Sequence, residues 1–156
     1  MHPFALAFVV ALLAHLATQW WLARRQIAHV GAHRSAIPAG FEGAVTHDEH
    51  AKAADYACAR QRLGVLEALY DTVVVLAMTL GGAISKLGLW ASSLVPPGVP
   101  AGTLQLLGVF AVLALLGLPF TIYRTFFLEQ RFGFNRTGPA TFLADQLKGW
   151  ALGAVL

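Results

Sequence analysis

The sequence has little charge. Only 12% of its 156 residues are Asp, Glu, Lys or Arg, against about 25% in an average soluble domain. By contrast, 57% of the residues are hydrophobic and the mean hydropathy is +0.62. This composition excludes an ordinary soluble domain, and we expect lipid to be the solvent of the chain.

Cysteine is nearly absent. Cys58 is the single cysteine of the sequence, so it has no partner within the chain for a disulfide and does not indicate the redox compartment. A free cysteine behaves as a small hydrophobe, and we predict a packing role for Cys58.

A zinc protease signature is also missing. None of the six histidines begins a His-Glu-x-x-His sequence, in which two imidazoles one helical turn apart bind zinc and the Glu acts as general base. The nearest approach runs from His47 to His50, which we interpret as the solvated start of a helix rather than as a pair of metal ligands. We therefore predict no catalytic, cofactor-binding or metal-ligating residue in this chain.

Long uncharged stretches predict membrane spans. A helix needs about 20 apolar residues to cross the ~30 Å hydrocarbon core. We predict spans over residues 4–22, 65–87 and 103–127, and the beginning of a fourth over 140–156. The first stretch lacks the basic start of a signal peptide, so we expect it to be a retained anchor. The predicted fold class is an all-α membrane protein with three complete transmembrane helices and the start of a fourth, forming one domain over residues 1–156.

The segments between the spans carry turn and cap signals. Residues 29–45 mix Gly, Pro, Ala and His without apolar periodicity, which predicts a loop. Thr46 and Glu49 then form a capping box, so a long helix should begin there and rise from the cytoplasmic side into the second span. The three prolines of residues 95–100 predict a rigid external turn before the third span.

Positive charges are distributed unevenly around the spans. They follow the first span, precede the second and lie between the third and fourth, whereas the loop after the second span has only Lys86. The positive-inside rule then places the N-terminus outside and the two basic loops in the cytoplasm. Topology thus explains the net charge of +3 and the pI of 9.4, and we expect no nucleic acid as a partner.

Residues 118–137 predict an exit from the membrane. A charge-free run over 104–123 is followed by Arg124 and Glu129, among six aromatic residues at the depth where rings meet lipid headgroups. Pro119 predicts an internal kink in the third span or the start of a last irregular turn. Gly133, between two phenylalanines, predicts a turn, and Pro139 suits the first turn of the next helix.

This segment resembles the amino-terminal membrane domain of the type one CAAX prenyl endopeptidases, which are integral membrane zinc metallopeptidases. The shared pattern is Leu-Pro, then Tyr, Phe and Glu, then Phe-Gly-Phe-Asn, Thr, and a Phe followed by Asp and Lys. It stands here at Leu118, Pro119, Tyr123, Phe126, Glu129, residues 132–135, Thr137, Phe142, Asp145 and Lys148. A weaker match runs through Phe41, Asp55, Tyr56 and Glu67, so the resemblance extends over most of the chain beyond the first span.

The resemblance implies the N-terminal part of a zinc metalloendopeptidase that cleaves prenylated or other membrane-associated peptides. The zinc ligands would follow Leu156, and these residues would supply the anchor and part of a chamber wall. The implied partners are the lipid bilayer, the remainder of the polypeptide and the peptide substrate. Only residues 149–156 are apolar after Lys148, too few to cross, so we expect the chain to continue.

Eight residues are candidates for structural or chamber support, because charges beside a membrane are less costly when they are paired. They are Glu67, Asp71, Tyr123, Arg124, Glu129, Asn135, Asp145 and Lys148. The alternative for the residues after the third span is a positive-inside loop with incidental ion pairs.

An acidic pair and a histidine lie inside predicted spans. Glu67 and Asp71, four residues apart, form one acidic face that favours structural pairing, with paired acid–base chemistry or a cation site as alternatives. His15, one turn before Thr18 and Gln19, predicts a structural hydrogen bond rather than a ligand or a proton relay.

Two other functions stay open on the sequence. One is a small free-standing four-helix membrane enzyme for a lipid or thiol substrate, and the other is a non-enzymatic membrane scaffold. A His-Glu-x-x-His helix encoded beyond Leu156 would separate the protease from both.

Overall fold

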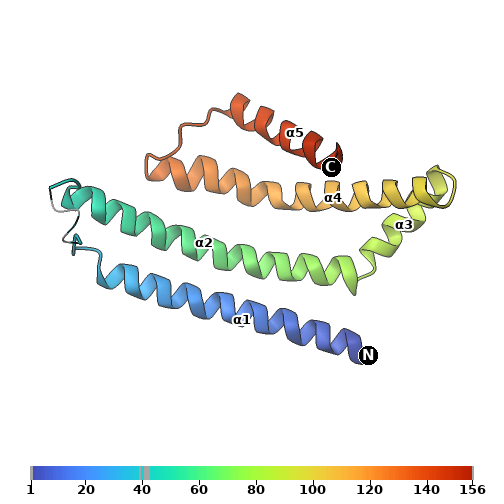
Figure 1. Ribbon diagram of the computed structural model, residues 1–156, viewed down its shortest axis with the longest axis horizontal. Coiled ribbons are helices and arrows are strands. Elements are labelled where there is room, and N and C mark those ends of the chain that lie inside the picture. Colours follow the sequence, from blue (N-terminus) through green and yellow to red (C-terminus); the bar gives the residue numbers. More distant parts are fainter. Residues whose placement is uncertain (1, 39, 41–42, 156) are drawn as a thin grey trace. The chain divides into compact units, whose positions relative to one another are not determined.

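The computed structural model describes residues 2–38, 40 and 43–155, and Phe41 and Leu156 lie outside the described residues. The described part contains five α-helices and no β-strand (Figure 1), which confirms the all-helical prediction. The helices are α1 (Pro3–Ala32), α2 (His47–Thr79), α3 (Ala83–Leu94), α4 (Val99–Tyr123) and α5 (Pro139–Val155). A π-helical segment, η2 (Arg124–Glu129), continues α4.

The chain divides into two compact units, Met1–Leu76 and Ala77–Leu156. The first unit consists of α1 and most of α2. The second unit contains the end of α2, followed by α3, α4, η2 and α5.

Helix α1 is longer than predicted. It ends at Ala32, so residues 29–32, which the sequence analysis assigned to a loop, are helical. The physical reason is that the good helix formers Arg24, Arg25, Gln26 and Ala28 carry the helix up to this stretch, and Pro38 is the first residue that cannot continue a helix. The ring Nδ1 of His33 lies 2.8 Å from the carbonyl oxygen of His29 and supports the helix end.

The predicted capping box at the start of α2 is confirmed. The Glu49 amide donates to the Thr46 hydroxyl (3.3 Å), and the Thr46 amide donates to the Glu49 carboxylate (3.0 Å). These reciprocal bonds satisfy amides that have no partner within the helix. Helix α2 therefore begins at His47, where the sequence placed it.

The helix through the second predicted span is broken. It ends at Thr79 and α3 begins at Ala83, whereas the sequence analysis expected one helix to residue 87. Two consecutive glycines cause the break, because Gly82 takes a φ of 74°, which side chains with a Cβ rarely adopt. The apolar residues after the break form a separate short helix.

The turn between α3 and α4 is shorter than predicted. Val99 and Pro100 belong to the first turn of α4, although the sequence analysis assigned them to the rigid turn. Proline fits this position because the first helical amides have no intrahelical acceptor. Gly98, with a φ of 109°, makes the turn just before the helix.

Helices α3 and α4 pack closely in the second unit. The Gln105 side-chain amide donates to the carbonyl oxygen of Ile84 across the pair (3.1 Å). A Cβ added at Gly88 would lie 3.1 Å from the Gln105 side chain. The missing side chain at Gly88 therefore lets the two helices approach.

The turn after η2 and the start of α5 lie where the sequence predicts. Pro119 lies inside α4, and the helix continues through η2 as a wider π-helical turn. Gly133 has a φ of 72° and makes the predicted turn, and Pro139 is the first residue of α5.

Two described helices are long and apolar enough to cross a membrane, α1 and the continuous helix Val99–Glu129. The bent pair α2 and α3 makes a third candidate if it counts as one span. Large apolar side chains are exposed on these helices, including Phe4 at 76% and Leu89 at 75%. Their exposure suits a surface solvated by lipid.

Candidate functional site

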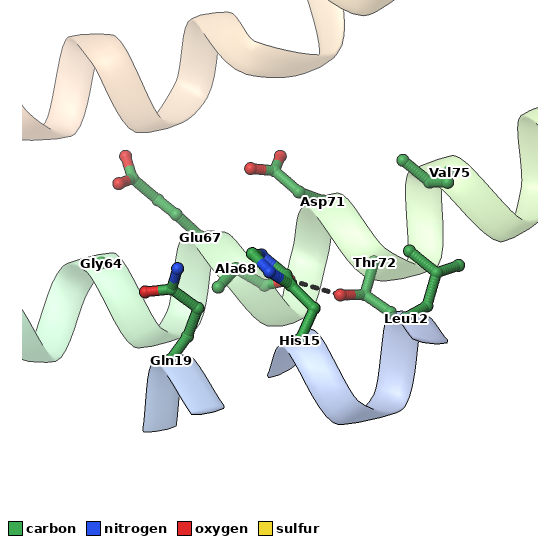
Figure 2. A pocket seen from close by; sticks show the side chains of 9 residues that line it. All are labelled: Leu12, His15, Gln19, Gly64, Glu67, Ala68, Asp71, Thr72 and Val75. Atoms are coloured by element: carbon green, nitrogen blue, oxygen red, sulfur yellow. Dashed lines mark hydrogen bonds between the residues drawn. The ribbon is translucent and has the colours of Figure 1, made fainter. Parts of the chain in front are cut away.

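A pocket of about 330 Å³ lies between α1 and α2 in the first unit (Figure 2). It is lined by Leu12, His15 and Gln19 from α1 and by Gly64, Glu67, Ala68, Asp71, Thr72 and Val75 from α2. Two of the eight candidate support residues, Glu67 and Asp71, therefore share one concave surface. The sequence did not predict that residues of the first span would meet them there.

The helical repeat explains why the pocket forms. On α2 the small residues Gly64, Ala68 and Thr72 recur every four positions, so they lie on one helical face. Glu67 and Asp71 recur at the same interval on the adjoining face. The small residues leave room beside α1, and the acidic residues border that room.

The polar side chains of α1 have two different kinds of surroundings. His15 and Gln19 line the pocket, whereas the Thr18 hydroxyl donates to the Ala14 carbonyl oxygen of its own helix (2.8 Å). Thr72 similarly donates to the Ala68 carbonyl oxygen (2.7 Å; Figure 2). Both threonines satisfy their hydroxyls within a helix, which leaves the imidazole, the amide and the carboxylates to define the polarity of the pocket. The predicted structural hydrogen bond of His15 stays a prediction.

An ion pair that the sequence analysis missed joins the end of α1 to α2. Two nitrogens of the Arg34 guanidinium, Nε and Nη2, each donate to one carboxylate oxygen of Asp55 at 2.8 Å. The hydrogen bond with Arg34 lowers the pKa of Asp55, and the same bond raises the pKa of Arg34. Asp55 entered the sequence analysis only through the weaker resemblance, since two residues 21 positions apart give no local signal.

Two further contacts lie near this ion pair. His50 Nε2 lies 3.1 Å from the His33 carbonyl oxygen, and the Cys58 thiol lies 3.9 Å from the Ile27 carbonyl oxygen. Cys58 is half-buried, in keeping with its predicted packing role. The imidazole of His50 thus helps connect the helices.

The candidate residues after α4 form a compact turn in the second unit. The Glu129 carbonyl oxygen accepts from the amides of Phe134 (2.9 Å) and Asn135 (3.3 Å). The Asn135 side-chain oxygen accepts from the Thr137 amide (2.7 Å). Asn135 therefore has a structural contact that holds the chain between η2 and α5.

Aromatic contacts organise the same region. The rings of Tyr123 and Phe127 stack with centroids 5.5 Å apart, and Phe126 meets Phe142 of α5 edge to face at 5.2 Å. The Phe126–Phe142 contact brings η2 and α5 together, although the sequence showed these residues only as parts of a shared pattern. Such aromatic pairs contribute about 0.5–1.5 kcal/mol beyond the area that they bury.

The other three candidates occupy different positions in the second unit. Arg124 is the first residue of η2 and is half-buried, whereas Asp145 and Lys148 are exposed on α5. Their roles as structural or chamber support stay predictions.

No group of metal ligands is found in the described part of the chain. Within residues 2–38, 40 and 43–155, no three His, Cys, Asp or Glu side chains are grouped closely enough to hold a metal ion. His50 contacts a backbone carbonyl oxygen, as described above.

The protein is an integral membrane protein. Its long apolar helices expose large apolar side chains, and aromatic residues cluster where the chain leaves α4. Residues 26–156 match the family model described as CAAX prenyl protease N-terminal, five membrane helices. The chain belongs to this family, as the sequence pattern predicted.

One solved structure shares the fold over nearly the whole chain. The crystal structure of S. mikatae Ste24p aligns with a TM-score of 0.87 and 20% sequence identity, covering 99% of this chain. The alignment covers 37% of the Ste24p chain, so this chain spans little more than a third of its length. No curated protein matches the chain by sequence.

Proposed function

We propose that this chain is the membrane-anchoring and chamber-forming N-terminal part of a zinc metalloendopeptidase that cleaves prenylated or other membrane-associated peptides. The family match over residues 26–156 carries the proposal. Zinc and its ligands would belong to the rest of the polypeptide, because the described residues provide no metal site.

The proposed topology has three complete spans and the beginning of a fourth. Helix α1 is the first span, the bent pair α2 and α3 the second, and α4 with η2 the third, while α5 enters the membrane again. The N-terminus is outside and the two basic loops are cytoplasmic, following the positive-inside rule.

The pocket between α1 and α2 supports a role in forming a chamber wall. Ionisable side chains within membrane spans usually face the protein interior or a water-filled cavity rather than lipid. His15, Glu67 and Asp71 come from two different helices and line one hollow. A polar face of this kind suits a surface turned toward a water-containing chamber.

The turn after η2 supports a second role, at the junction with the rest of the polypeptide. Glu129 contributes its carbonyl oxygen to this turn, and its charged side chain stands at the proposed membrane boundary. We propose that Glu129, with Arg124, Asn135, Asp145 and Lys148, supports this junction or the entrance to the chamber.

The test uses the full-length protein in lipid vesicles with a fluorescent membrane-associated peptide. We expect cleavage that a zinc chelator abolishes and that added zinc restores. Glu129→Ala should lower the cleavage rate or the folded yield, whereas Asp48→Ala, on the exposed first turn of α2, should change neither. Absence of chelator-sensitive cleavage across prenylated and unprenylated peptides would contradict the proposed activity, and unchanged rate and yield for Glu129→Ala would remove its supporting role.

A further inference from the structure

Two Trp–Arg pairs lie on α1 at the end of the first span. The guanidinium carbon of Arg24 lies 4.7 Å from the ring centre of Trp20, and that of Arg25 lies 4.9 Å from the ring centre of Trp21. At these distances the face of an indole ring attracts the cation. Each arginine follows its tryptophan by four residues, so each pair shares one helical face. Two adjacent faces of α1 therefore carry the same cation–π arrangement.

Both pairs lie on a side of α1 that α2 leaves uncovered. The face toward α2 is marked by Gln19, which lines the pocket, by Ala23, which is 1% exposed, and by Ile27, whose carbonyl oxygen lies near the α2 thiol. In contrast, Trp20 and Trp21 are 51% and 54% exposed, and both arginines are exposed as well. The two pairs are thus accessible to a partner outside the α1–α2 pair.

The two guanidiniums keep their hydrogen-bond donors free. Neither Arg24 nor Arg25 makes an ion pair or a side-chain hydrogen bond within the described residues, whereas Arg34 is held by Asp55. A guanidinium that stacks by its face still presents its N–H groups, because all of them lie in the plane of the group. A phosphate matches this planar fork and accepts two parallel hydrogen bonds from it.

The stacking also places the two charges at the depth of lipid headgroups. Helical side chains point back toward the N-terminus, so each guanidinium lies over the tryptophan one turn nearer the apolar stretch. Tryptophan rings favour the membrane–water interface, and the predicted first span ends at residue 22. Leu13, seven residues before Trp20 on the same face, is 53% exposed. A ligand that matches this side of α1 has a negatively charged head and an apolar tail.

We propose that the Trp20–Arg24 and Trp21–Arg25 pairs bind the phosphate of an anionic phospholipid, whose acyl chains lie along the exposed apolar side of α1. A zwitterionic lipid offers the same phosphate, but the two guanidiniums repel its cationic group, so its net attraction is weaker. On the proposed topology the lipid belongs to the cytoplasmic leaflet, whose surface is negatively charged. This binding goes beyond the proposed protease function and does not depend on cleavage.

The test compares two lipids that differ only in the headgroup. The full-length protein in a neutral detergent is titrated with phosphatidylglycerol or phosphatidylcholine of identical acyl chains, and native mass spectrometry measures the Kd of the first bound lipid. Two arginines at ~1 kcal/mol each beside an anionic lipid correspond to a factor of about thirty. We therefore expect phosphatidylglycerol to bind about thirtyfold more tightly. Equal affinities for the two lipids would overturn the proposal without any variant.

Two double variants and one matched control locate the effect. Arg24→Gln with Arg25→Gln should reduce the preference for phosphatidylglycerol to within about threefold, because both charges are lost. Arg24→Lys with Arg25→Lys should give an intermediate preference, because lysine keeps the charge but lacks the planar fork. Arg60→Gln with Arg62→Gln removes the same charge from exposed positions on α2 and should keep the full preference. Melting curves check that each variant is folded.

Four other results would overturn the proposal. An equal loss of preference in the two glutamine variants would assign the effect to overall charge, and a full preference in the lysine variant would do the same. An unchanged preference in the α1 glutamine variant would mean that another helix of the full-length protein covers this side of α1. Displacement of the lipid by soluble glycerophosphate would assign the arginines to a free phosphate ester. A protein that prefers phosphatidylglycerol but cleaves no peptide would contradict only the proposed protease activity.

Discussion

Two helix pairs in this chain are joined in different ways. Helices α1 and α2 leave a polar pocket between them, and the Arg34–Asp55 ion pair connects them beyond the predicted spans. Helices α3 and α4 instead approach closely at Gly88, where Gln105 donates a hydrogen bond to the Ile84 carbonyl oxygen. The first pair borders a polar hollow, whereas in the second pair a glycine lets a polar side chain of the partner helix come close.

The largest expected effect is on the close pair. Gly88→Leu should place a branched side chain where a Cβ alone already lies 3.1 Å from Gln105, and we expect a loss of about 1–3 kcal/mol from overpacking. The folded yield and the melting temperature in detergent measure this loss. Gly102→Leu is the matched control, because nothing lies within 4 Å of its Cβ position. Equal losses for both variants would show that glycine replacement itself, rather than the helix contact, is responsible.

A smaller effect is expected from the hydrogen bond in the same pair. Gln105→Leu removes the donor to Ile84, and hydrogen bonds between membrane helices contribute about 0.6 kcal/mol on average. The melting temperature should fall by less than for Gly88→Leu, while Gln26→Leu, an exposed site on α1, serves as the control. A fall larger than that of Gly88→Leu would mean that the polar contact, not the absent side chain, governs the close approach.

The smallest effect is expected at the ion pair of the open pair. Asp55→Asn should lower the melting temperature by only a few degrees, because exposed ion pairs contribute little and are screened by salt. The lowered pKa of Asp55 means that its contribution is complete above the ordinary aspartate pKa of ~3.9 and is lost as the pH falls through the lowered value. Melting curves between pH 7 and pH 2, at low and high salt, check this sign. An unchanged difference between variant and parent at pH 2 would contradict it.

Local signals in the sequence predicted the helix starts and turns well. The capping box at Thr46, the turn at Gly133 and the first residue of α5 all follow from interactions within a few residues. The predicted helix ends were less accurate. The ends of α1 and α2 depend on how far helix propensity extends before a residue that cannot continue the helix. The sequence analysis continued one helix through Gly82, whose positive φ instead separates α3 from α2.

Contacts between distant residues were the part that the sequence could not supply. The spacing of Glu67 and Asp71 placed them on one face of a helix. That this face borders the same pocket as His15 and Gln19 depends on how α1 lies against α2. The Arg34–Asp55 bond and the Phe126–Phe142 contact likewise join different elements. A single sequence gives the face on which a residue lies, and tertiary packing decides what that face meets.

The π-helical turn over Arg124–Glu129 has a directional consequence for everything that follows it. A π-turn accommodates one more residue than an α-turn, and each residue advances an α-helix by about 100°. Side chains after this point are therefore rotated by one position from the azimuth that the repeat of α4 would give them. Removing a single residue from the segment would rotate Gln130 and Arg131 about the helix axis by about 100°, so that their side chains would point in a different direction around the helix.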